Sequence, residues 1–273
     1  MTPPAPTTVN GHARVLLAPN PGPMTLEGTN SYLLSGNGGS SVVIVDPGPL
    51  DDGHLALLAG AGPVELILIT HRHADHTEGA AALAAATGAP VRAADPAYCV
   101  DGHPLRDGET VAAAGLDIEV LATPGHTADS VCFLLPDPDS EPDPDADPDF
   151  RGRRSVLTGD TILGRGTTVI APPDGSLRDY LGTLRLLAAL GPARALPAHG
   201  PQLPDLEEIA LAYLAHREQR LDQIRAALVR LGLDPQVAEV SAVTDAVYHD
   251  VDASVRRAAE FSVAAQLDYL RGG

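Results

Sequence analysis

Four residues of the types that bind metal ions fall within six positions, and this segment constrains the fold more than any other. It reads His71-Arg72-His73-Ala74-Asp75-His76 and follows Glu65–Thr70, whose apolar side chains predict a buried strand. Zinc binds imidazole nitrogens and carboxylate oxygens in catalytic sites. On a turning backbone, His71 and His73 can point toward one centre while Asp75 and His76 face a second. The segment therefore predicts two adjacent metal sites at a strand end.

Two sites need more ligands than this segment supplies. Three later segments each place one candidate ligand beside Gly or Pro after a predicted strand: Pro124-Gly125-His126, Gly159-Asp160 and Ala198-His199-Gly200. Strand ends are where a sheet delivers its functional groups. The candidate metal ligands are therefore His71, His73, Asp75, His76, His126, Asp160 and His199. The remaining histidines lack partner motifs, and we interpret them as solvated or hydrogen-bonded: His12, His54, His103, His216 and His249.

Short β-type runs punctuated by Gly, Pro and Asp fill the chain up to about residue 160. They predict strands at 14–18, 31–34, 42–45, 65–70, 91–93, 118–122, 131–135 and 155–157. An Ala-rich helix is expected from Thr77, as its N-cap, to Gly88, and another at 176–190. Strands that alternate with helices in this way favour an α/β fold in which two sheets lie between helices, an αββα sandwich. Helices predicted at 206–231, 237–247 and 254–270 form a small helical domain, 205–273, after a catalytic domain, 1–204.

Composition narrows the function classes. The formal net charge of −18 disfavours loose association with nucleic acid or an anionic membrane. It permits an anionic substrate, because bound metal ions reverse the charge locally. Residues 136–149, PDPDSEPDPDADPD, are acidic and proline-rich, which predicts a disordered surface loop.

Two further features of the sequence bear on its environment. Cys99 and Cys132 are too few for a disulfide framework, and we expect small core residues at both positions. No run approaches the ~20 apolar residues that cross a bilayer. Met1–Asn10 has neither a basic start nor a hydrophobic stretch, so we expect a cytoplasmic protein with no membrane partner.

The pattern His-x-His-x-Asp-His, followed by Pro-Gly-His, Gly-Asp and a late His-Gly, resembles the signature of the metallo-β-lactamase superfamily. The resemblance implies a pair of zinc ions, one held by His71, His73 and His126 and the other by Asp75, His76 and His199. Asp160 would bridge the two ions. Iron or manganese could replace zinc, because nitrogen and oxygen ligands alone do not choose strongly among these metals.

Asp46, in Val45-Asp46-Pro47-Gly48, matches the first motif of that superfamily. The resemblance implies that its carboxylate supports the ligands from behind, in the second coordination shell. Such a role is reasonable because ligating histidines need an acceptor for their other N–H. A turn-forming Asp is the alternative interpretation.

A closer resemblance covers nearly the whole chain. Residues 20–33, 164–168 and 216–220 are similar to the β-lactamase-like-protein-2 family, which joins the hydrolase domain to a C-terminal winged-helix-like domain. The sequence ends directly after its last predicted helix, so we expect a short or absent β wing. Acidic residues outnumber basic ones in that region, which disfavours nucleic-acid binding there.

The predicted function is hydrolysis by a metal-bridging hydroxide, because two zinc ions lower the pKa of bound water toward ~7. Asp75 would help to orient this hydroxide, and Thr167 and Tyr180 are candidates for lining the substrate pocket. In the resembling family, one branch cleaves single-stranded RNA and fungal relatives act as thioesterases on carrier-bound polyketides.

An RNA substrate needs a basic groove, often with aromatic stacking platforms, and this chain has 3% aromatic residues. We therefore expect a small-molecule or carrier-bound acyl ester or thioester, with single-stranded RNA cleavage by an endoribonuclease as the alternative. A non-catalytic metal-binding protein and a nucleic-acid-binding regulator are further alternatives. The sequence leaves the oligomeric state open, with a homodimer among the options.

Overall fold

The structure is a computed structural model that describes residues 5–136, 154–250 and 256–272. The chain forms two compact units. The first contains Met1–Ala122, Asp129–Gly166 and Pro192–Leu206, and the second contains Thr123–Ala128, Thr167–Gly191 and Glu207–Gly273. The predicted domain boundary at residue 205 stays a prediction. Apart from Pro136, the predicted acidic loop lies outside the described residues.

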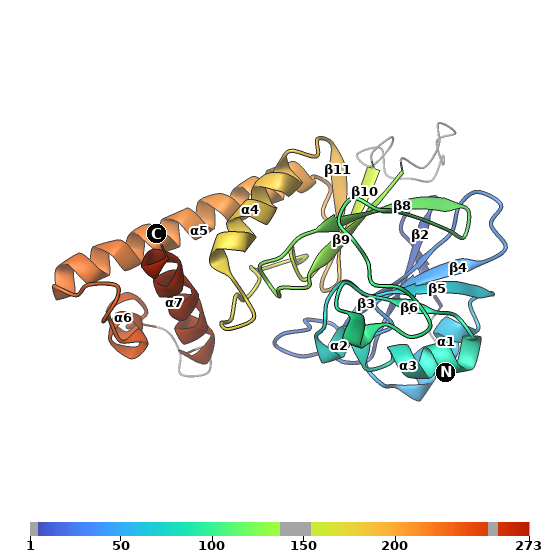
Figure 1. Ribbon diagram of the computed structural model, residues 1–273, viewed down its shortest axis with the longest axis horizontal. Helices are drawn as coiled ribbons and strands as arrows, with labels where there is room; N and C mark the ends of the chain where they lie inside the picture. The colour runs from blue at the N-terminus through green and yellow to red at the C-terminus, as the bar shows by residue number, and fades with distance from the viewer. Residues whose placement is uncertain (1–4, 137–153, 251–255, 273) are drawn as a thin grey trace. The chain divides into compact units, whose positions relative to one another are not determined.

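Two β-sheets form the centre of the first unit (Figure 1). One sheet has the strand order β1-β2-β3-β4-β5-β6, comprising Thr7–Thr8, Ala13–Leu17, Asn30–Leu34, Val42–Val45, Val64–Leu68 and Val91–Arg92. The other has the order β11-β10-β9-β8-β7, comprising Ala193–Pro197, Arg154–Gly159, Val131–Leu135, Leu116–Ala122 and Thr110–Ala113. Strands β1 and β7 were not predicted from the sequence.

Strand direction brings the candidate site segments together. In the first sheet β4 and β5 are parallel, so their carboxyl ends lie at the same edge. In the second sheet β10 and β11 are parallel, and β8 shares their direction because β8 and β10 are both antiparallel to β9. Each predicted metal-ligand segment follows one of these carboxyl ends, those of β5, β8, β10 and β11.

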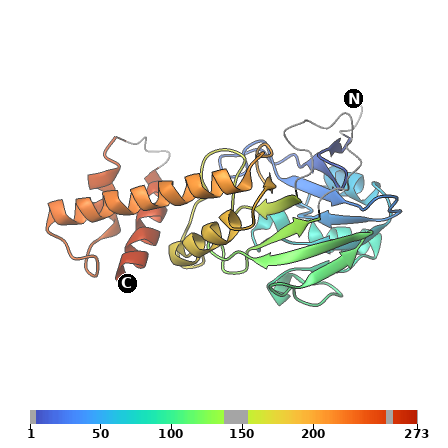
Figure 2. The ribbon, with the colours of Figure 1, turned by 90° about the horizontal axis from the view of Figure 1, so that it is seen from above.

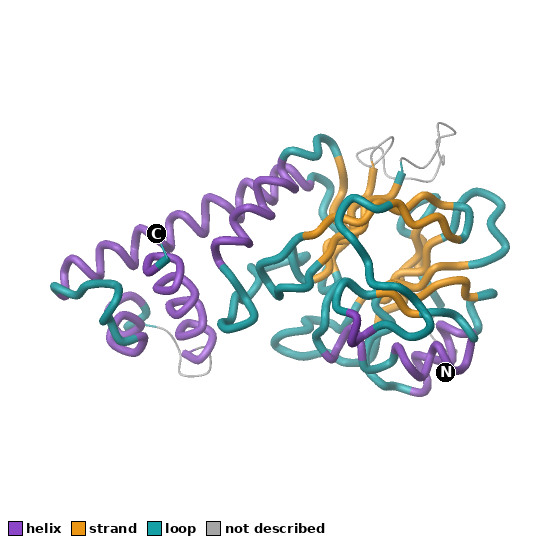
Figure 3. Tube along the Cα trace, viewed as in Figure 1, coloured by secondary structure: helices purple, strands orange, loops and turns teal. Residues whose placement is uncertain are grey.

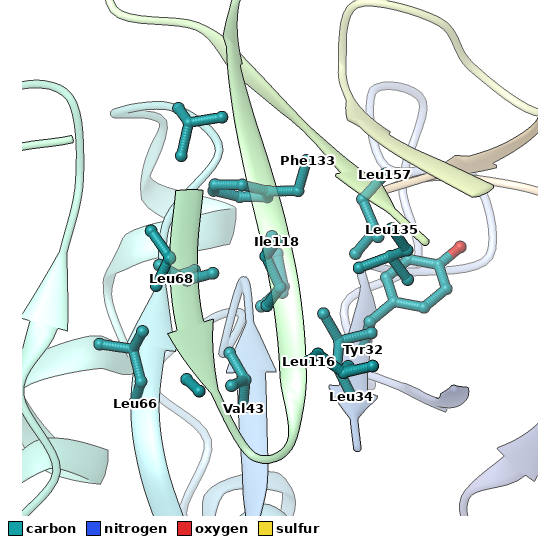
Figure 4. Close-up of a cluster of buried hydrophobic side chains, with 14 of the residues drawn as sticks. Tyr32, Leu34, Val43, Leu66, Leu68, Leu116, Ile118, Phe133, Leu135 and Leu157 are labelled. Carbon is teal, nitrogen blue, oxygen red and sulfur yellow. The ribbon is translucent and has the colours of Figure 1, made fainter. Parts of the chain in front are cut away.

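The two sheets enclose a core of mainly aliphatic side chains (Figure 4). Tyr32, Val43 and Leu68 from the first sheet belong to the same buried cluster as Ile118 and Phe133 from the second. Buried and exposed residues alternate along most of β8, as expected for a strand with one face in the core. The chain has no Trp and few other aromatic residues, so interlocking branched side chains fill this space.

Helices cover the outer face of the first sheet. Leu55 and Leu58 of α1 (Asp52–Ala59) and Leu83 of α3 (Ala80–Thr87) form a second buried cluster with Ile44 and Ile67. Helix α1 was not predicted. The 3-10 helix η1 (Pro96–Tyr98) follows β6.

The single helix predicted from Thr77 to Gly88 is wrong at its start. The chain forms a short helix α2 (Ala74–Thr77), and α3 begins separately at Ala80. The amide of Gly79 donates to the carbonyl of Gly48, 3.0 Å away, instead of continuing the helical ladder. The predicted end is confirmed, since Gly88 caps α3 in the left-handed conformation with φ of 74°.

In the second unit the described residues after 206 form helices and connecting loops, with no strand among them. They make up α5 (Leu206–Leu231), α6 (Val240–Val247) and α7 (Arg256–Arg271), while α4 (Leu177–Ala188) comes earlier in the chain. Figure 2 shows α5 as one uninterrupted helix, and Figure 3 distinguishes the helices from the connecting loops. A small core of Ile224, Leu228, Val243, Val263 and Leu267 joins α5, α6 and α7.

Among the residues that the structure describes, no helix combines the length and the apolar character needed to cross a membrane.

Substitution of Phe133 by alanine is expected to lower the free energy of unfolding by about 3–5 kcal/mol, the range for removal of a buried aromatic ring. The ring is 0% exposed and lies between the two sheets. Denaturant titration of the purified variant measures the change. Leu50→Ala is the control, since Leu50 is 62% exposed and its loss should change stability by less than about 0.5 kcal/mol. Similar losses for the two variants would contradict this packing.

Candidate metal centre

The predicted ligands lie on loops at the carboxyl ends of the strands and form two groups. The first group is His71, His73, His126 and Asp160, and the second is Asp75, His76 and His199. Each residue offers one ligand atom, and within a group these atoms all lie within 4.8 Å of one another. Neither group contains a cysteine or any other histidine of the described chain. The roles of these residues as ligands stay predictions, but the side chains lie together as predicted.

Asp46 lies behind the histidines and is 2% exposed. It follows β4 with a positive φ of 52°, a conformation that Asp tolerates better than most residues. Its Oδ1 accepts a hydrogen bond from the amide of Thr70 at 2.8 Å, and its Oδ2 accepts one from the Thr70 hydroxyl at 2.7 Å. Oδ2 also lies 2.9 Å from Nδ1 of His76. This contact places the proton of His76 on Nδ1 and leaves Nε2 for a metal ion.

The same carboxylate reaches His71 through Thr70. The Thr70 hydroxyl gives its proton to Asp46, so its oxygen is an acceptor for Nδ1 of His71, 3.1 Å away. The relay leaves Nε2 of His71 without a proton, and this atom lies 3.0 Å from Nδ1 of His73. One buried carboxylate therefore orients imidazoles of both groups.

Backbone carbonyls orient two other histidines in the same sense. Nδ1 of His199 donates to the carbonyl of Gly28 at 3.1 Å, and Nδ1 of His126 donates to the carbonyl of Val169 at 2.9 Å. In both rings Nε2 is the nitrogen left to face a ligand. The loop that carries Gly28 is held by its neighbour Thr29, whose hydroxyl donates to the backbone carbonyl of Asp75 at 3.1 Å.

The second group contains buried nitrogens that lack a hydrogen bond. Nε2 of His76 and Nε2 of His199 have no hydrogen-bond partner in the described chain. They lie 3.5 and 3.2 Å from Oδ2 of Asp75, and 3.6 and 3.3 Å from Oδ1 of Asp160. Imidazole nitrogens and carboxylate oxygens that converge in this way are the donor set that zinc and related ions bind. The residues therefore fit a metal ion.

The charges of the second group favour a cation. Burial opposes protonation of His76, but the carboxylates of Asp46 and Asp160 outweigh burial and raise its pKa to about 9. Burial likewise opposes the ionisation of Asp75, yet the neighbouring His199 imidazole holds the pKa of this carboxyl well below its usual range. The carboxylates attract a positive charge to the position where the imidazole nitrogens converge.

Sequence reasoning missed several supporting residues. Nε2 of His54 lies 2.9 Å from the hydroxyl of Ser31, which itself donates to the backbone carbonyl of Asp46 at 2.6 Å. Burial lowers the pKa of His54, so the imidazole is neutral. It is hydrogen-bonded, as interpreted from the sequence, but it helps to fix the strained backbone of Asp46. No spacing pattern could have revealed this contact between α1 and β3, although a Thr directly before the first His could have suggested the role of Thr70.

The two predicted pocket-lining residues lie in different environments. Tyr180 of α4 is 0% exposed and packs beneath the guanidinium of Arg217, which argues against the predicted pocket-lining role. The apolar face of α4 explains its burial, because neighbours on that face such as Leu181 and Leu184 are also buried. Thr167 is exposed and directly precedes the buried Thr168. Its role stays a prediction.

The family model and the related proteins that match this chain point to the same family. Residues 24–139 match the metallo-beta-lactamase superfamily. Lactamase-like protein vrtG of Penicillium aethiopicum is 33% identical over 231 residues, covering 82% of this chain and 68% of that protein. Beta-lactamase-like protein 2 homolog of Caenorhabditis elegans is 31% identical over 270 residues, covering 93% of this chain and 82% of that protein. For lactamase-like protein nscB of Neosartorya fischeri the covered share of the relative is 64%, so the chain spans less than two thirds of that protein.

Solved structures agree on the fold. Metallo-beta-lactamase family protein TTHA1429 from Thermus thermophilus has a TM-score of 0.73 at 22% identity, covering 97% of this chain and 95% of that one. TTHA1623 in a di-iron-bound form has a TM-score of 0.52 at 25% identity, covering 70% of this chain and 95% of that one. The predicted fold class, two sheets with helices and additional C-terminal helices, is confirmed.

Replacement of Asp46 by asparagine is expected to weaken metal binding by about 10- to 100-fold, the usual effect of losing a partner of a ligating histidine. The amide keeps the shape of the carboxylate but removes the negative charge that His76 and Thr70 share. Competition with a chelator of known affinity measures the change. Asp101→Asn is the matched control, because Asp101 is exposed and also has a positive φ that Asn accepts. Equal affinities for the two variants would remove Asp46 from the metal centre.

Proposed function

Since the chain belongs to the metallo-β-lactamase superfamily of metal-dependent hydrolases, we propose that it binds two metal ions and hydrolyses an ester or thioester of an acyl compound. The observation that carries the proposal is the gathering of its ligand-type side chains into two groups. A single ion does not need so many candidate ligands, because zinc in a catalytic site takes three protein ligands and a water.

We assign the ligands by group. His71, His73 and His126 hold the first ion, and Asp75, His76 and His199 hold the second. Asp160 is shared, which is supported by its membership of the first group and by its Oδ1 lying 3.6 and 3.3 Å from Nε2 of His76 and His199.

Zinc is the ion that we propose, with iron and manganese as substitutes. The donors are nitrogen and oxygen, which do not choose strongly among these metals, and the similar protein TTHA1623 was solved in a di-iron-bound form. Metal analysis of protein expressed with each metal distinguishes these ions.

When bound, the ions supply Lewis acidity and lower the pKa of a coordinated water toward neutrality. The chain supplies orientation. Asp75 is ionised at neutral pH because its pKa is lowered, and its side chain is 29% exposed. It can therefore accept a hydrogen bond from a water molecule that enters from solvent, and we propose that it orients the attacking water.

Composition supports an acyl substrate. The chain carries a net charge of −18 and 3% aromatic residues, whereas proteins that bind single-stranded RNA combine a basic groove with stacking platforms. An uncharged ester or thioester, free or attached to a carrier, meets no such electrostatic barrier. Cleavage of single-stranded RNA is therefore an outcome of the test below.

Removal of metal with a chelator is expected to abolish hydrolysis, and added zinc should restore it. His71→Ala and Asp160→Ala should each lower kcat/KM by more than about 100-fold, because losing a ligand costs at least as much as losing its outer partner. His249→Ala is the control, since its side chain is 69% exposed and pairs with Asp250. Metal analysis accompanies the kinetics. A protein that keeps two equivalents of zinc yet hydrolyses nothing would be a non-catalytic metal-binding protein.

A side-by-side assay tests the substrate class. Acyl thioesters of increasing chain length, aryl esters and a fluorescent single-stranded RNA are each incubated with the same zinc-loaded protein. We expect measurable turnover of the esters or thioesters and none of the RNA above the rate of the His71→Ala variant. Cleavage of RNA with no acyl hydrolysis would overturn the proposed substrate class but leave the hydrolase assignment intact.

A further inference from the structure

A buried arginine in α5 has no role in the chemistry described above. Arg217 is 6% exposed, and its contacts in the described chain are with a backbone carbonyl and an aromatic ring instead of a carboxylate. Its guanidinium lies 5.3 Å from the ring centroid of Tyr180 and donates to the carbonyl of Thr168, while its Nε has no hydrogen-bond partner among the described residues. Burying a cation without a carboxylate is unfavourable, so the contacts that it does make are informative.

One of these contacts leads to a candidate metal ligand. Thr168 accepts from Arg217, and the next carbonyl, that of Val169, accepts from Nδ1 of His126 at 2.9 Å. Two consecutive peptide groups thus join the guanidinium to the imidazole. Fixing the Thr168 carbonyl restrains the Val169 carbonyl, because only the two backbone dihedrals of Val169 separate their planar peptide units.

A second path reaches the same histidine through Tyr180. Gly125, directly before His126, has φ of 143°, and a Cβ on it would lie 2.5 Å from the Cα of Tyr180. Only glycine allows this close approach. The hydroxyl of Thr183 donates to the carbonyl of Pro124 at 2.8 Å, and the amide of Ser176 donates to the carbonyl of Gly125 at 2.9 Å. The loop that carries His126 is therefore clamped against α4, and Arg217 covers the aromatic ring of that clamp.

We propose that Arg217 is a positioning residue for His126. Arg217 holds the His126 loop through the Thr168–Val169 peptide and the Tyr180 ring. Nδ1 of His126 therefore keeps the Val169 carbonyl as its acceptor, and Nε2 of His126 points away from that carbonyl. The proposal rests on the proposed function, because it takes His126 as a metal ligand. It gives α5 a role in metal binding, since an α5 side chain supports the loop that carries one ligand.

The test measures metal affinity in the full chain by chelator competition and by the absorption spectrum of the cobalt-substituted protein. Arg217→Met removes the donor and the charge while keeping the aliphatic bulk. We expect one of the two metal ions to bind about 10- to 100-fold more weakly, with the other unchanged, as for loss of an outer partner of a ligand. The metal affinity of Arg217→Lys should lie between those of the wild-type protein and Arg217→Met, because lysine keeps the charge but not the planar guanidinium.

Arg225→Met is the matched control, since Arg225 lies on the same helix, is more than half exposed and pairs with Asp222. A double-mutant cycle with His126→Ala separates positioning from general stabilisation. If Arg217 acts through His126, Arg217→Met should change metal affinity no further once His126 is absent. An unchanged metal affinity in Arg217→Met, or an equal loss in both backgrounds, would overturn the proposal.

Thermal unfolding in the presence of a chelator reports whether each variant folds without metal. If Arg217→Met does not fold, the comparison rests on Arg217→Lys, and wild-type affinity in that variant together with a wild-type cobalt spectrum would overturn the proposal. A wild-type protein that binds no metal would instead refute the proposed function, so the two failures are distinguishable.

Discussion

A single buried carboxylate organises the candidate centre. Asp46 accepts two hydrogen bonds from Thr70 and faces Nδ1 of His76, in an interior that is almost closed to water. A buried charge is tolerated only when its lone pairs are satisfied, and here the partners that satisfy it are the residues that must be held in place. The loop after β5 thus stabilises the carboxylate, and the carboxylate in turn fixes the conformation of that loop. Its own backbone is secured from the other side by Ser31 and His54.

The candidate ligands could be predicted from the sequence because their spacing is local. His71, His73, Asp75 and His76 follow one strand within six positions, and strand directions explain why distant segments end beside them. The helix after this segment could not be predicted as well. Helix propensity does not indicate that the Gly79 amide donates a hydrogen bond to the carbonyl of Gly48. This contact exists only once β4 and β5 pair. Tertiary contacts decided that boundary.

Residues that act through the backbone left no signal in the sequence. The acceptors for His199 and His126 are the carbonyls of Gly28 and Val169, and any residue type offers a carbonyl. Tyr180 illustrates a different limit of sequence reasoning. It is a candidate for lining the substrate pocket by its sequence, yet its side chain is fully buried beneath Arg217. Burial on an amphipathic helix depends on which face packs inward, and α4 turns this face inward together with Leu181 and Leu184.

The partners of the histidines also differ in kind, and this difference has chemical consequences. Nδ1 of His76 faces a carboxylate, whereas Nδ1 of His126 and Nδ1 of His199 face neutral carbonyls. A charged acceptor raises the basicity of an imidazole more than a neutral one does, and basicity governs how strongly the other nitrogen donates to a cation. The second group also contains Asp75, whose lowered pKa keeps it ionised. The two groups are therefore electrostatically unequal even though each contains histidines and one aspartate, because the Asp46 carboxylate faces His76 of the second group directly and reaches His71 of the first only through Thr70.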